Sequence, residues 1–159
     1  MKTIELTIKG EAETQFQTVN VQQLEQMIKE LLPNYNSDDS WFFDNYYVAL
    51  PVKNFGSVLI WWWKVLNQIN YCPEVFDCDD YAKLFSSLLA CCQYNASGIV
   101  IGELYYKGKF LGYHAWNLIL LVNPQNKFKI YEFEPQLANI LLDHKSFDGF
   151  EYVGRWVIW

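Results

Sequence analysis

The sequence predicts an α+β fold, in which helices come first and an antiparallel sheet follows. Apolar residues recur at helical spacing in the first half of the chain, whereas after Gly98 they alternate as in strands and are separated by turn residues. The 159 residues show no repeat and no linker long enough to divide them. A chain of this length usually builds one hydrophobic core, so we expect a single domain over residues 1–159.

Four elements are expected in the first part of the chain. Period-two alternation predicts strands, apolar residues spaced by three and four predict helices, and Pro33 and Pro51 mark two of the ends. The expected elements are a strand over residues 1–9, a helix over about 21–32 with Asn20 as N-cap, a β-prone segment over 41–50 and a helix over about 56–67. Residues 1–50 carry no functional signal, and we interpret them as an N-terminal elaboration.

A third helix is expected to begin near Cys78 and to run to about Cys92, because Tyr81, Leu84 and Leu88 place apolar side chains on one face. Four strands are expected after it. They cover residues 98–106, 111–122, 127–134 and 152–159.

Charge and composition exclude several classes of protein. The chain carries 18 acidic and 12 basic residues, and its scattered lysines and arginines argue against a nucleic-acid partner. The most apolar run, residues 58–63, is too short to span a membrane, and the first residues do not resemble a secretion signal. We therefore expect a cytoplasmic protein that binds neither nucleic acid nor membrane, and the sequence is silent on its oligomeric state.

Cys78 differs from the other three cysteines. Cys72, Cys91 and Cys92 have no metal-binding spacing, and we expect them to be core residues. Cys78 stands at the start of a predicted helix, where unpaired N–H groups favour thiolate over thiol. Asp79 and Asp80 follow it and oppose this effect, so a cation such as calcium is expected to offset their charge.

His114 and Glu134 lie on two strands that the turn at residues 123–126 folds into a hairpin. Pairing Val122 with Lys127 places His114 opposite Glu134 and Pro135, with an uncertainty of one residue in the register. An imidazole beside Cys78 would accept the thiol proton, and a carboxylate would orient the imidazole. Glu132 and Asp143 are alternatives to Glu134, and His144 is expected to be a solvated loop residue.

The three segments 76–82, 114–117 and 134–136 resemble the papain-like and transglutaminase-like cysteine hydrolases, and most of all the calcium-dependent cysteine protease domain of the fairy-ring mushroom agglutinin. The resemblance covers about residues 60–136. It implies a papain-like fold with the nucleophile helix packed on the antiparallel sheet. The chain has no lectin domain beside this region, so the resemblance does not imply that it recognises sugars.

The resemblance also implies roles for individual residues. Cys78 would be the nucleophile, His114 the general base and Glu134 the third member of a catalytic triad. Asp79 and Asp80 would bind calcium. Gln136 and Trp116 would lie near the substrate and the oxyanion.

The expected function is that of a cysteine hydrolase, a protease or amidase that acts on a peptide or protein substrate and is activated by calcium. Two alternatives stay open: a catalytically inactive binding module on the same scaffold, and a transglutaminase-like acyl transferase. Reactivity of Cys78 separates an enzyme from a binding module, because only the enzyme needs an accessible, activated thiol.

Overall fold

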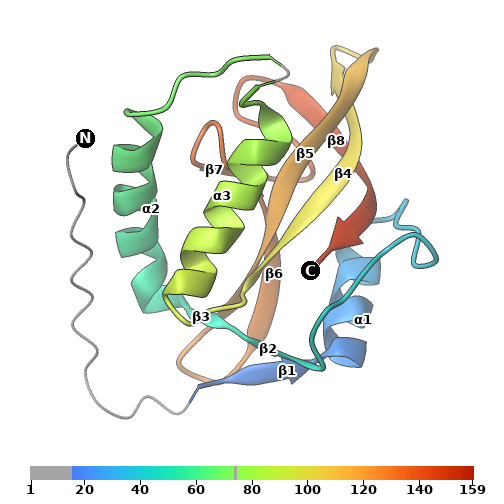
Figure 1. The fold of residues 1–159 in the computed structure, drawn as a ribbon. Helices are drawn as coiled ribbons and strands as arrows, with labels where there is room; N and C mark the ends of the chain where they lie inside the picture. Colours follow the sequence, from blue (N-terminus) through green and yellow to red (C-terminus); the bar gives the residue numbers. More distant parts are fainter. Residues whose placement is uncertain (1–15, 74) are drawn as a thin grey trace.

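The computed structural model describes residues 16–73 and 75–159. The strand expected over residues 1–9 lies outside the described residues. The order of the elements can be followed in Figure 1.

A six-stranded sheet forms the centre of the molecule (Figure 1). Five strands lie in the order β7-β6-β5-β4-β8 and are antiparallel, and β3 pairs in parallel with the end of β5. The strands are β3 (Leu50–Pro51), β4 (Ser97–Tyr106), β5 (Lys109–Val122), β6 (Phe128–Glu134), β7 (Asn139–Ile140) and β8 (Phe150–Ile158). A separate ribbon pairs β1 (Thr18–Asn20) with β2 (Tyr46–Val48).

Three helices cover the sheet. Helices α2 (Val52–Leu66) and α3 (Cys78–Cys91) lie side by side on one face, and α1 (Val21–Leu31) lies on the other (Figure 1). Within the described ranges, no helix is both long and apolar enough to cross a bilayer.

Local sequence explains where the helices begin. The side chain of Asn20 accepts a hydrogen bond from the backbone N–H of Gln23 at 2.9 Å, and Gln23 returns the bond, so α1 starts with a capping box. Helix α2 begins four residues earlier than expected. Pro51, with φ of −60°, stands immediately before Val52 in extended conformation and is the N-cap.

A buried amide fixes α3 to the sheet. Asn117 on β5 has no exposed surface, and its side-chain NH₂ donates to the carbonyl of Ala82 at 3.1 Å and to the hydroxyl of Ser86 at 3.0 Å. The same group also lies 3.2 Å from the carbonyl of Gly98 on β4. Because a buried amide left without partners is costly, these bonds specify one position for α3. Cys78 lies four residues before Ala82, so its position is fixed as well.

The expected strands after residue 98 are confirmed to within three residues at each end. The papain-like α+β description is corrected, because the molecule is mostly β-sheet with three helices. Its sheet recruits residues 50–51 and 139–140, and helices cover both faces rather than forming one N-terminal layer. Strands of two residues have no readable alternation, which is why the sequence did not reveal them.

Gly102 supplies a first test of this packing. A methyl group at position 102 would lie 2.2 Å from the carbonyl oxygen of Val153 and 2.7 Å from Cη2 of Trp116, whereas one at Gly56 in α2 would touch nothing within 4 Å. We expect Gly102→Ala to lower the free energy of unfolding by about 2 kcal/mol or more through overpacking. Gly56→Ala should raise it by about 0.5–1 kcal/mol through helix propensity.

Urea unfolding of both variants measures the two changes. Equal effects would mean that the close approach at Gly102 is relieved at no cost by movement of β8 and Trp116.

Candidate functional site

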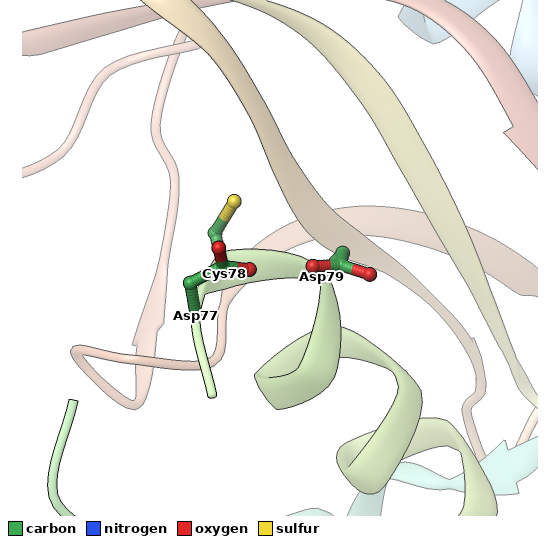
Figure 2. A group of neighbouring side chains, drawn as sticks. All are labelled: Asp77, Cys78 and Asp79. Carbon is green, nitrogen blue, oxygen red and sulfur yellow. The ribbon is translucent and has the colours of Figure 1, made fainter. Parts of the chain in front are cut away.

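Cys78 is the first residue of α3 (Figure 2). Asp77 and Asp80 form a capping box around it, and the backbone N–H of Asp77 lies 3.4 Å from Oδ2 of Asp80. Figure 2 shows the thiol at the start of the helix, with Asp77 and Asp79 on either side of it. The capping box pairs the backbone N–H of Asp80 with Asp77, and the sulfur lies at the end of the helix that carries a partial positive charge.

His114 and Glu134 form a close pair across β5 and β6. Nε2 of His114 lies 2.6 Å from Oε2 of Glu134, and the two side chains are 11% and 2% exposed. The register makes this contact, because Val122 pairs with Phe128 rather than with Lys127. That offset of one residue puts Glu134 diagonally across from His114 on the same face, where long side chains can meet.

The imidazole of His114 is held as a cation. Burial lowers the pKa of His114, but its interactions with Cys78 and Glu134 outweigh burial and raise the pKa to about 9. The ring is therefore protonated at neutral pH. A protonated imidazole beside a cysteine favours the nucleophilic thiolate.

The pair of His114 and Glu134 can be reached from α3 because β6 does not extend along β5 as far as His114. Strand β6 pairs only with residues 117–122 of β5, so the first half of β5 has no described strand neighbour on that side. The first turn of α3 meets β5 there. The structure thus brings Cys78, His114 and Glu134 together from three elements.

Gln136 and Trp116 support the pair in different ways. The backbone N–H of Gln136 donates to Oε1 of Glu134 at 3.0 Å and so fixes the carboxylate. Trp116 has no exposed surface, and its ring lies nearly parallel to that of His114, with an interplanar angle of 18° and 6.2 Å between centroids. Both residues therefore shape the site from beneath, and Trp116 offers no surface to a ligand.

Tyr152 also lies beside the imidazole, in contact with Trp116. Its ring centroid lies 5.7 Å from that of His114, and only 4% of the residue is exposed. Burial, together with the charge of Glu134, raises the pKa of Tyr152, so the hydroxyl stays neutral. His114 therefore lies beside two aromatic rings that contact each other, and it pairs with one carboxylate.

A second pair of histidine and glutamate lies behind the first and was not expected. Nδ1 of His144 is 2.5 Å from Oε2 of Glu132, whose side chain is 2% exposed. The polar segment around His144 predicts a solvated loop residue instead. The alternation of Glu132 with Glu134 was the available signal, since it puts both carboxylates on one buried face.

Asp79 and Asp80 lie beside the ammonium group of Lys83. Lys83 forms an ion pair with Asp79, and its Nζ lies 3.5 Å from Oδ1 of Asp80. A hydrogen bond with Asp77 and the ion pair with Lys83 lower the pKa of Asp79. One ligand atom from each of Asp77, Cys78 and Asp79 lies within 4.8 Å of the others. The carboxylates suit calcium, whereas the sulfur does not.

The other cysteines are not core residues as expected. Cys72 and Cys91 are exposed, and all four thiols are free. Burial raises the pKa of Cys92. These three thiols provide internal references for the reactivity of Cys78.

Two hollows, of about 230 and 320 Å³, lie away from these residues. Pro51, Tyr94 and Val122 line the first, and Asn126 and Phe128 line the second. Both are near the end of β5 that is remote from His114. The chemistry of the thiol, imidazole and carboxylate identifies the candidate site more directly than the size of a hollow does.

Comparison with known proteins gave a structural likeness alone. No protein-family model matches the chain, and no curated protein does. A structure of Polyporus squamosus lectin bound to the human-type influenza-binding epitope Neu5Acα2-6Galβ1-4GlcNAc matches with a TM-score of 0.64 and 21% identity. A structure described as a PSL1a–E64 complex matches with a TM-score of 0.61 and 21% identity.

The chain spans about half the length of these neighbours. The matches cover 90% of this chain and 50% and 51% of the lectin and PSL1a chains. At this identity the likeness shows the shared fold.

These matches correct the expectations drawn from the papain-like resemblance. The neighbours are described as a lectin and as a PSL1a complex, and neither description supports a papain-like or transglutaminase-like hydrolase. The assignments as cysteine hydrolase, protease or amidase and as an enzyme, together with the papain-like fold, are therefore replaced by a lectin-like fold. The expected peptide substrate receives no support from either match.

Proposed function

We propose that this chain is a ligand-binding module whose binding site is centred on the thiol of Cys78. The observation that carries the proposal is the contact of 2.6 Å between His114 and Glu134, with Cys78 at the same imidazole. The ligand is one that carries an electrophilic carbon or a group that hydrogen-bonds to a thiolate.

Three features support a reactive thiol. Cys78 stands at a helix N-terminus, and its side chain interacts with the imidazolium of His114. Glu134 is buried and keeps His114 in place and protonated. A structure of a PSL1a–E64 complex matches this chain over 51% of the PSL1a chain, which makes E64 a compound to test here.

Alkylation rates provide the test. At pH 7, Cys78 should react with iodoacetamide about 10-fold or more faster than the exposed Cys72 and Cys91, because its thiol lies beside the imidazole of His114. His114→Ala should remove this advantage, and Glu134→Gln should reduce it. Mass spectrometry of tryptic peptides gives the rate for each cysteine in one sample.

Asp39→Asn, in a loop away from the site, is the control and should leave all rates unchanged. His144→Ala is unsuitable as a control because His144 contacts Glu132. Saturating E64 should protect Cys78 and leave Cys72 unprotected. If Cys78 reacts no faster than Cys72 in the folded protein, the proposed site does not exist.

Glycan binding is a second candidate function, and the lectin neighbour favours it. Aromatic rings gather around Tyr113, the residue before His114: Tyr113 is 68% exposed, and its ring centroid lies 5.9 Å from that of the exposed Phe110 and 6.3 Å from that of the partly buried Trp156. A flat apolar ring with a polar edge suits the alternating C–H and hydroxyl surface of a sugar. Because the chain spans only half of the lectin chain, the sugar ligand enters here as a proposal.

Immobilised Neu5Acα2-6Galβ1-4GlcNAc tests this candidate. The wild-type chain should bind it, and Tyr113→Ala should weaken binding about 10-fold by removing one stacking ring worth about 1–1.5 kcal/mol. Phe147→Ala, at a ring that is 80% exposed, is the matched control and should bind as wild type does. Equal binding by both variants, or none by wild type, would exclude a sugar site on these rings.

Calcium at Asp79 and Asp80 is retained as a proposal. Since Lys83 pairs with both carboxylates, calcium has to displace it, and binding should be weak. Lys83→Gln should tighten calcium binding about 5-fold, in line with the strength of an exposed ion pair. Asp79→Asn should abolish it. Isothermal titration measures both, and unchanged heats in Asp79→Asn would place any calcium elsewhere.

We also propose that the chain works in a reducing, cytoplasmic setting without a nucleic-acid partner. The four free thiols and the acidic balance of the chain support this.

A further inference from the structure

We propose that Trp116, Glu132 and His144 form a positioning chain that fixes the orientation of the His114 imidazole. The inference rests on the proposed site at Cys78 and names residues that act on it without touching a ligand. Each link is a contact between a buried group and a neighbour that leaves it one orientation.

The first link joins Trp116 to His114. The indole is fully buried and lies nearly parallel to the imidazole, at 18°. It reaches this place over Gly102, where any side chain would collide with its Cη2. Tyr152 packs edge-on against the indole at 5.3 Å. Rotation of the indole would therefore displace the imidazole that it faces.

The second link sets the rotation of the indole. Nε1 of Trp116 donates to Oε1 of Glu132 at 3.0 Å. Among the described residues, no other acceptor is recorded for this N–H. A ring held only by apolar packing can tilt, whereas a buried N–H hydrogen bond fixes the orientation of the ring in its plane.

The third link holds the carboxylate. A buried carboxylate is costly unless both of its oxygens have partners. The second oxygen of Glu132 is 2.5 Å from Nδ1 of His144. Glu132 thus has Trp116 on one oxygen and His144 on the other, and both contacts fix its plane.

The loop that carries His144 adopts an uncommon backbone conformation. Asp143 and His144 have φ of +49° and +60°, in the left-handed region that non-glycine residues rarely enter. The carbonyl of His144 accepts a bond from the backbone N–H of Tyr152 at 2.8 Å. The two residues form the centre of a two-residue turn that backbone hydrogen bonds of 3.0 Å close in both directions, and this turn presents His144 to Glu132.

Three variants separate positioning from simple stabilisation. Glu132→Leu removes the acceptor for Trp116, Glu132→Gln restores an acceptor without charge, and Trp116→Phe keeps a ring but loses its N–H. In variants shown to be folded by urea unfolding, Glu132→Leu and Trp116→Phe should slow iodoacetamide modification of Cys78 about 10-fold. Glu132→Gln should stay within about 3-fold of wild type. The rates at Cys72 and Cys91 should not change.

The ring ¹⁵N and ¹³C shifts of His114 give an independent readout. They should move in Glu132→Leu and return toward wild type in Glu132→Gln. A matched pair tests the last link: His144→Gln should lower the rate at Cys78, and Lys145→Gln should not, although Lys145 also ties this loop through its ion pair of 2.9 Å with Glu151.

The outcomes distinguish the two proposals. If Cys78 is unreactive in wild type, the proposed function fails, and the His114 shifts still decide the positioning chain. If wild-type Cys78 is reactive but folded Glu132→Leu shows the same rate and the same His114 shifts, the positioning chain is wrong. If Glu132→Leu does not fold, Trp116→Phe decides in the same way.

Discussion

The pairing of Asn117 with Phe133 is the constraint on which the rest of the structure depends. It fixes which side chains of β5 and β6 share a face. One face receives Asn117 and Phe133, which meet α3, and the other receives Trp116, Glu132 and Glu134. A shift by one residue would exchange the two faces and place carboxylates in the apolar contact with α3.

The same constraint links the helix to the sheet chemistry. Because Asn117 bonds to the carbonyl of Ala82, the first turn of α3 stands beside the half of β5 that β6 does not cover. His114 lies on that half, so the thiol of Cys78 reaches an imidazole that a complete sheet would have covered. The site exists where one strand runs on beyond its neighbour, and its groups are preorganised by buried bonds rather than by loops.

Periodic segments could be predicted from the sequence, and contacts between distant loops could not. Helix α1 and the strands β4, β5, β6 and β8 follow from apolar spacing, and the start of α3 at Cys78 follows from its acidic first turn. The register of β5 and β6 was wrong by one residue, because turn length alone did not specify it. The bond between His144 and Glu132 depends on two left-handed residues that nothing in the local composition indicates. The fold class and the hydrolase function, which came from a likeness of short motifs, had to be corrected.

The bare backbone at Gly102 has a consequence for anyone who wishes to transplant this site. The indole of Trp116 occupies the space that a side chain at position 102 would fill. The sheet therefore accepts this indole only where residue 102 has no Cβ atom. A graft that copies only the thiol, the imidazole and the carboxylate onto another β-sheet would leave the imidazole on an ordinary, filled surface. The recipient sheet must have a glycine at the position that corresponds to Gly102, in addition to the grafted side chains.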